Sequence, residues 1–167
     1  MKFDQLSAVV ADDQRTSRGV VTEILRSVGM RDIRHAGDGA EALHLCMARR
    51  PSFVLIDLEM SNDGIRSLRQ IRRSECHGLR RVPVTMLTAA ATRSIVESMR
   101  DAGANEIIVK PLTTAKLLGR IQNSLLHTRP FVDCTSYVGP ERRRTNSQPY
   151  RGPFRRESDG LSDVMEI

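Results

Sequence analysis

Short apolar runs alternate with stretches of helical periodicity over the first 127 residues of the chain. Apolar runs predict strands at 6–11, 53–56, 82–87 and 106–109, with a weaker one at 32–36. Apolar residues at helical spacing between 20 and 28 predict a first helix, and the same criterion predicts helices at 38–50, 65–73, 93–103 and 113–127. The pattern therefore predicts five strand–helix units.

Local signals mark several ends of these elements. Asp38 is followed three residues later by Glu41, which is the pattern of an N-terminal capping pair. Gly103 is placed to end the helix that begins at residue 93. Pro83 must lie near the start of its strand, because it has no N–H to donate to a neighbouring strand.

The predicted strands are apolar throughout and alternate with helices, which is typical of a parallel sheet covered on both faces. Right-handed crossovers then give a doubly wound α/β fold with a five-stranded parallel sheet and five helices. We expect this domain to occupy residues 1–127.

The last 40 residues, 128–167, have a different character. They hold four of the seven prolines and show no helical periodicity, and they are too short to form a domain with its own core. Two similar pieces, YVGPERRR at 137–144 and YRGPFRRE at 150–157, share a Tyr-x-Gly-Pro-x-Arg-Arg pattern. The matching residues are Tyr137, Gly139, Pro140, Arg142 and Arg143 in the first piece and Tyr150, Gly152, Pro153, Arg155 and Arg156 in the second.

The composition indicates the class of protein and its cellular compartment. The chain is 40% hydrophobic and 28% charged, typical of a soluble globular protein, and no apolar run is long enough to cross a membrane. Its three cysteines, Cys46, Cys76 and Cys134, lack metal-site spacing, and its N-terminus lacks the features of a signal peptide. We therefore expect free thiols and a cytoplasmic protein with no membrane partner.

The formal net charge of +6 is compatible with a negatively charged partner, either a nucleic acid or an acidic protein. Residues 1–127 hold 19 Lys and Arg against 14 Asp and Glu, and the tail holds 7 against 6. The excess is thus spread over the chain, as expected for solvated helix surfaces.

Polar residues follow four of the predicted strands. Asp12 and Asp13 follow the first, Asp57 the third, Thr88 the fourth and Lys110 the fifth. Each has a plain structural alternative, such as a helix cap for Asp13 or a solvated charge for Lys110. Because the carboxyl ends of parallel strands form one edge of the sheet, the set as a whole predicts a ligand site.

The chemistry of this set suits a metal ion and a phosphoryl group. Keeping three neighbouring carboxylates ionised costs free energy unless a cation is present. Mg2+ prefers carboxylate, water and phosphate oxygens as ligands. A hydroxyl and an ammonium can contact phosphoryl oxygens, and a carboxylate can itself be the nucleophile. The chain has no GxxxxGK[ST] loop, so a nucleotide is not the obvious phosphate source.

These residues resemble the receiver domain of bacterial two-component response regulators. The resemblance covers about residues 6–127 and rests on Asp12-Asp13, Asp57, Thr88-Ala89 and Lys110-Pro111. It implies the flavodoxin-like strand order 2-1-3-4-5. It also implies that Asp57 accepts a phosphoryl group from a histidine kinase or a histidine phosphotransfer protein.

The resemblance assigns the remaining roles position by position. Mg2+ would be held by Asp12, Asp13, Asp57 and the backbone carbonyl of Glu59. The Thr88 hydroxyl and the Lys110 ammonium would contact the phosphoryl oxygens, and the Lys110–Pro111 peptide bond would be cis.

Two positions depart from the family pattern. Ile107 stands where most receivers have the aromatic residue of the conformational switch, and we expect it simply to pack against the sheet. Glu59 adds an acid at the mouth of the site. It is either solvated, or it repels the phosphoryl group or orients water and so changes the lifetime of the phosphorylated state.

The resemblance implies a stand-alone response regulator that signals through protein contacts and has no enzymatic turnover beyond slow autodephosphorylation. Three alternatives stay open: a phosphorelay shuttle, a phosphatase-type hydrolase, and a nucleic-acid-binding regulator acting through its tail. The tail itself is either a basic linker, a peptide that docks on a partner or on the receiver, or a nucleic-acid contact. A homodimer formed through the fourth and fifth helices is a further possibility.

Overall fold

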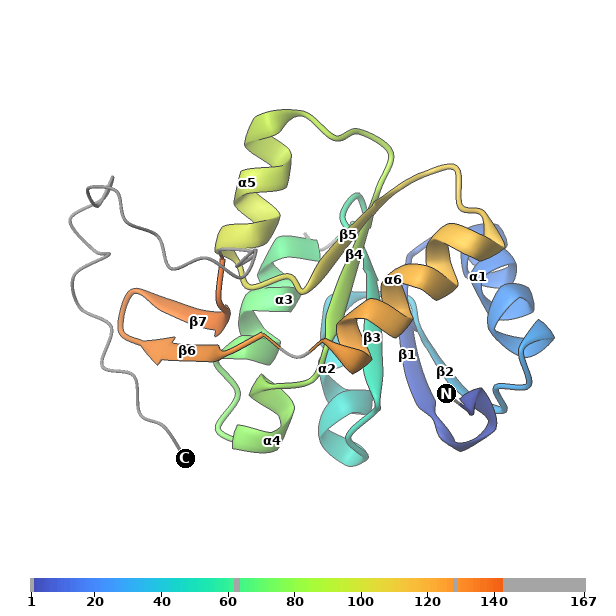
Figure 1. Ribbon diagram of the computed structural model, residues 1–167, viewed down its shortest axis with the longest axis horizontal. Helices are drawn as coiled ribbons and strands as arrows, with labels where there is room; N and C mark the ends of the chain where they lie inside the picture. The colour runs from blue at the N-terminus through green and yellow to red at the C-terminus, as the bar shows by residue number, and fades with distance from the viewer. Residues whose placement is uncertain (1, 62–63, 128, 143–167) are drawn as a thin grey trace.

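The computed structural model describes residues 2–61, 64–127 and 129–142. Five strands form a parallel sheet in the order β2-β1-β3-β4-β5, which confirms the predicted fold class and order (Figure 1). The strands are β1 Ser7–Ala11, β2 Asp32–Ala36, β3 Phe53–Asp57, β4 Val84–Thr88 and β5 Glu106–Val109. The helices are the short 3-10 turn η1 Phe3–Gln5, then α1 Arg15–Ser27, α2 Gly39–Ala48, α3 Gly64–Arg72, α4 His77–Arg80, α5 Arg93–Asp101 and α6 Thr114–Leu126.

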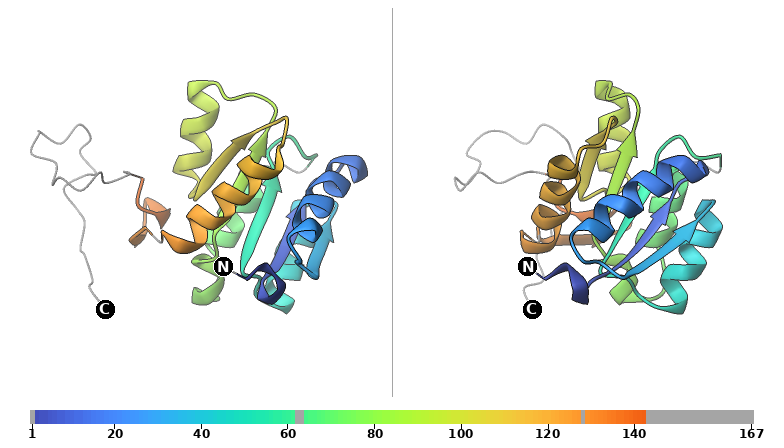
Figure 2. Two further views of the ribbon diagram at one scale, coloured as in Figure 1. Left: turned by 45° about the vertical axis from the view of Figure 1, so that its right-hand side comes forward. Right: turned by 90° about the vertical axis from the view of Figure 1, so that its right-hand side faces the viewer.

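Successive residues of the central strands face two separate apolar layers. Val54 and Ile56 of β3 belong to the core cluster that includes residues of α2, α3 and α5, whereas Phe53 and Leu55 belong to the cluster that includes residues of α1 and α6. Figure 2 shows α1 and α6 together on one side of the sheet. None of the helices in the described ranges is long and apolar enough to span a bilayer.

The residues predicted to mark the ends of helices and strands lie at the ends of those elements in the structure. The Asp38 side chain accepts a hydrogen bond from the Glu41 N–H at 2.8 Å, and Glu41 Oε2 accepts one from the Gly37 N–H at 2.7 Å. Gly103 follows α5 with a φ of 98°, a conformation that favours glycine. Strand β4 begins at Val84, directly after Pro83.

The prediction of five helices was one short. The additional helix is α4, a single turn in the connection between α3 and β4. Four residues are too few to produce a periodic apolar pattern, and Leu79 alone anchors the turn in the core.

The described part of the tail is folded against the domain. Phe131–Cys134 and Tyr137–Pro140 pair as an antiparallel hairpin, β6 and β7. The Tyr137 side chain is buried and donates its hydroxyl hydrogen to the Pro140 carbonyl oxygen at 2.6 Å. The hairpin lies beside the ends of α3, α4 and α5 (Figure 1). Arg143 and the whole second piece, 150–157, lie outside the described residues.

These contacts bear on the three interpretations of the tail. The Arg142 guanidinium covers one face of the Tyr137 ring at 4.1 Å from its centre, and the Tyr137 side chain is buried, so it is not available to stack on a base. The first piece therefore docks on its own domain, which was one of the predicted alternatives.

Candidate functional site

The predicted site residues meet at the carboxyl edge of the sheet. Asp12 follows β1, Asp57 and Thr88 are the last residues of β3 and β4, and Lys110 follows β5. These four strands are neighbours in the sheet, so parallel pairing alone brings the four side chains to one place.

The acidic part of the site is a cluster of three carboxylates. Asp12, Asp13 and Asp57 each offer one oxygen, and these oxygens lie within 4.8 Å of one another. Asp12 and Asp57 are buried, whereas Asp13 is exposed. The backbone N–H of Gln14 donates to Asp12 Oδ1 at 2.8 Å, and that of Ser61 donates to Asp13 Oδ2 at 3.0 Å. These bonds hold the carboxylates in position near one another.

Lys110 supplies the positive charge that faces this cluster. Its Nζ lies 2.6 Å from Asp57 Oδ1 and 3.5 Å from Asp12 Oδ2. Burial alone would lower the pKa of Lys110, but the hydrogen bond to Asp57 and the charges of Asp57, Asp12 and Glu59 together raise it. The ammonium therefore stays protonated beside Asp57.

The surroundings of Asp57 disfavour its charged form in the absence of a metal. Burial raises the pKa of Asp57 to about 6, with the Asp12 and Glu59 charges adding to the rise and Lys110 opposing it. One ammonium does not offset the burial and mutual repulsion of these carboxylates.

The carboxylates present fit a divalent cation. Beyond the Lys110 ammonium, no hydrogen-bond donor in the described part of the chain satisfies Oδ1 of Asp57. Oxygen ligands from two or three carboxylates are the donor type that Mg2+ prefers. The contribution of the Glu59 backbone carbonyl stays a prediction.

Glu59 makes a contact that sequence reasoning did not predict. Its Oε1 lies 2.7 Å from the Thr88 hydroxyl oxygen and accepts a hydrogen bond from the Ala89 N–H at 2.8 Å. Burial would raise the pKa of Glu59, but its hydrogen bonds with Thr88, Ala89, Asp57 and its own backbone together lower it. Although Glu59 is an exposed residue, its carboxylate is thus held against the end of β4.

The remaining predicted positions are found as follows. The Lys110–Pro111 peptide bond is cis. Ile107 is half-buried and packs against the apolar cluster of the α2, α3 and α5 face, in register with Met86 of β4. It therefore packs against the sheet, as its sequence position suggested.

The sequence matches the family model of the response regulator receiver domain over residues 8–122. The transcriptional regulatory protein PdtaR of Mycobacterium tuberculosis is 36% identical over 125 residues, which is 74% of this chain but only 58% of PdtaR. The chemotaxis protein CheY-3 of Vibrio cholerae is 36% identical over 113 residues, covering 67% of this chain and 85% of CheY-3.

Solved structures give the same result for the fold. The receiver domain of the sensor histidine kinase PA1611 from Pseudomonas aeruginosa has a TM-score of 0.66 and 30% identity, and the match covers 72% of this chain and 97% of that domain. Its structure holds a magnesium ion coordinated in the active-site cleft. From the family model, the relatives and the fold together, this chain belongs to the response regulator receiver domain family.

Proposed function

We propose that this chain is a response regulator whose Asp57 carboxylate accepts a phosphoryl group from a phosphohistidine. The observation that carries the proposal is the Asp57–Lys110 pair, with 2.6 Å between Oδ1 and Nζ, beside two further carboxylates. Such a site joins a nucleophile, a fixed cation and a set of metal ligands, which are the elements that phosphoryl transfer requires.

In the proposed step, an Asp57 oxygen attacks the phosphorus, the phosphorus–nitrogen bond breaks, and the leaving imidazole takes any proton it needs from solvent. Lys110 then shifts from the carboxylate to a phosphoryl oxygen, because the negative charge has moved outward. The Thr88 hydroxyl and the Ala89 N–H stand at the end of β4 to donate to the other oxygens.

Mg2+ is the metal that these ligands suit. It would be held by Asp12, Asp13 and Asp57 and, by the family resemblance, by the Glu59 carbonyl. When bound, it supplies positive charge to the phosphoryl oxygens. The protein side chains align the acceptor oxygen and exclude water from its buried face.

The partners implied are a histidine kinase or a histidine phosphotransfer protein upstream, and a protein target downstream. The matched region spans 58% of PdtaR, so the activity of that whole regulator is not carried over to this chain. CheY-3, of which 85% is covered, is named as a chemotaxis protein.

The test is transfer from a labelled donor. A purified, autophosphorylated histidine kinase is mixed with this protein, with Asp57→Asn and with Asp101→Asn, an acid-to-amide control outside the site. We expect the label to move to the wild-type protein and to Asp101→Asn, and not to Asp57→Asn. Release of inorganic phosphate from a small phosphate ester with multiple turnovers would instead support the hydrolase alternative and overturn the proposal.

A further inference from the structure

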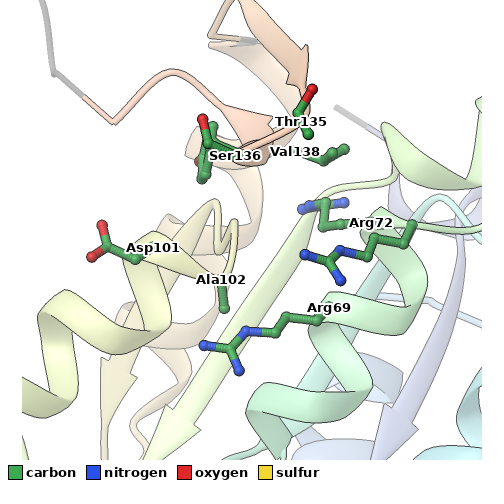
Figure 3. Close-up of a pocket in the computed structure, with 9 residues that line it drawn as sticks. Arg69, Arg72, Asp101, Ala102, Thr135, Ser136 and Val138 are labelled. Carbon is green, nitrogen blue, oxygen red and sulfur yellow. The ribbon is translucent and has the colours of Figure 1, made fainter. Parts of the chain in front are cut away.

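A small polar cavity lies where the hairpin meets the ends of α3 and α5, at the sheet edge opposite the acidic cluster. It has a volume of about 220 Å³. Figure 3 shows Arg69 and Arg72 extending from α3, Asp101 at the end of α5, and Thr135 and Ser136 at the hairpin turn. None of these residues takes part in the proposed phosphoryl transfer.

Arg72 is a buried cation without a buried anion to balance it. Its side chain is 1% exposed and donates to the carbonyl oxygens of Gly103 at 2.9 Å, Arg80 at 2.6 Å and Val82 at 2.8 Å. Its other terminal nitrogen donates to Asn105 Oδ1 at 2.7 Å. All of these acceptors are neutral, and no carboxylate in the described ranges forms an ion pair with Arg72.

The positive charge at the cavity is not limited to Arg72. Arg69 of α3 and Arg73, which directly follows the helix, also line it and are exposed. They lie four residues apart, and the Arg73 N–H donates to the Arg69 carbonyl oxygen at 3.0 Å, so the two side chains project from the same side of the helix. Neither side chain has a hydrogen-bond or ion-pair partner among the described residues. Like charges at this spacing repel, so the arrangement disfavours the free helix unless an anion is bound.

Only one lining carboxylate opposes these arginines. Asp101 Oδ1 is 3.3 Å from Arg142 Nη1, so its charge is shared with a cation of the tail. The cavity therefore has three guanidinium groups and one already paired acid. A buried, unbalanced cation is costly, and an anion next to it would reduce that cost.

The chemistry of the lining selects the kind of anion. Guanidinium groups bind phosphate oxygens in a bidentate manner, and three arginines line this cavity. Pockets for drug-sized ligands have roughly 300–1,000 Å³. A cavity of about 220 Å³ is smaller, which favours a single phosphate or diphosphate group over a nucleotide.

We propose that this cavity binds a small oxyanion of the phosphate type, held by Arg69 and Arg73 over the buried Arg72. The anion is either free or the terminal phosphate of a larger molecule, since both present the same oxygens. Because α3, α5 and the hairpin all line the cavity, the anion would hold the hairpin in its docked position and stabilise the folded chain.

The test is pyrophosphate binding to the full chain by isothermal titration calorimetry, supported by thermal unfolding. EDTA is present throughout, so that metal-dependent binding near Asp57 does not contribute. The double variant Arg69→Gln/Arg73→Gln is compared with Arg26→Gln/Arg31→Gln, which removes two exposed arginines from the region of α1 and β2 and so changes the net charge equally. All four side chains are exposed, so we expect both variants to fold.

We expect pyrophosphate to bind the wild-type protein and the Arg26/Arg31 variant, and to bind the Arg69/Arg73 variant at least tenfold more weakly. Equal binding to all three proteins, or equal loss in both variants, would overturn the proposal, as would no binding to the wild type. Titration with inorganic phosphate and with phenyl phosphate then separates the two sources: binding of both indicates a terminal phosphate, and binding of phosphate alone indicates the free anion. Phosphoryl transfer to Asp57 is measured separately, so failure here leaves the proposed function unaffected.

Discussion

The Glu59 carboxylate is hydrogen-bonded to Thr88, with 2.7 Å between Oε1 and the threonine hydroxyl oxygen. The same carboxylate oxygen accepts the Ala89 N–H. These are the two donors that the proposed reaction assigns to phosphoryl oxygens. An internal carboxylate thus stands where the transferred group would bind, and it must leave before that group is accepted.

Removal of this carboxylate should accelerate phosphorylation. We expect Glu59→Ala to form the aspartyl phosphate about ten- to a hundredfold faster from acetyl phosphate and Mg2+, because displacing a hydrogen bond to a charged group costs on the order of 1.5–3 kcal/mol. The measurement is the initial rate of adduct formation by mass spectrometry, with Glu75→Ala, an exposed acid after α3, as the control. A slower rate in Glu59→Ala would show that the carboxylate assists transfer instead.

Besides its proposed contact with the phosphoryl group, the Lys110 side chain should stabilise the folded protein when no metal is bound. Lys110→Met leaves Asp57 and Asp12 without their nearby cation, so we expect a loss of about 1–3 kcal/mol in the free energy of unfolding. Urea denaturation in EDTA measures it, with the exposed Lys116→Met as the control. Added Mg2+ should restore part of the loss, and an unchanged midpoint in EDTA would contradict the prediction.

The raised pKa of Asp57 gives a defined dependence of stability on pH. With a folded-state pKa of about 6 against an ordinary 3.8, the folded protein binds this proton more tightly than the unfolded chain does. The Asp57 contribution is therefore fully present below about pH 4 and is lost as the pH rises through about 6.

Asp57→Asn removes that contribution. The quantity compared is the free energy of unfolding of the variant minus that of the wild type, measured in EDTA. We expect this difference to be larger, in favour of the variant, at about pH 8 than at about pH 4. Urea denaturation of both proteins at the two pH values provides the comparison. The same stability difference at both values would show that the Asp57 pKa is not raised.

The hairpin should be part of the folded unit. A chain ending at His127 loses β6 and β7, and with them the cover over the buried Arg72, whose guanidinium lies 5.9 Å from the centre of the Phe131 ring. We expect its thermal midpoint to fall by several degrees, since about 1 kcal/mol corresponds to roughly 2–8 °C in a domain of this size. The reference is a chain ending at Arg142, which keeps every hairpin contact described above. Equal midpoints would show that the hairpin adds no stability.

The domain was predictable because its signals are local or topological. Apolar strands and amphipathic helices follow from sequence periodicity, and the cap at Asp38 follows from two residues three apart. The meeting of Asp12, Asp57, Thr88 and Lys110 needs no side-chain detail, because parallel strands end at the same edge.

The parts that were missed depend on long-range contacts. The hairpin sequences FVDC and YVGP give no clear alternation of apolar and polar residues, and the strands are stabilised by Arg72 and by the ring contact of Arg142 with Tyr137. The Glu59 contact depends on which way one side chain turns, which no spacing in the sequence specifies.

The most direct test of the central claim is the intact mass of the protein after incubation with acetyl phosphate. The wild-type protein and Asp57→Asn are each incubated with acetyl phosphate in Mg2+ and in EDTA. We expect a single phosphoryl adduct on the wild type that requires Mg2+ and is absent from Asp57→Asn. An adduct of equal amount on Asp57→Asn, or one that forms equally in EDTA, would contradict the assignment of Asp57 and of the acidic cluster as a metal-assisted phosphoryl acceptor.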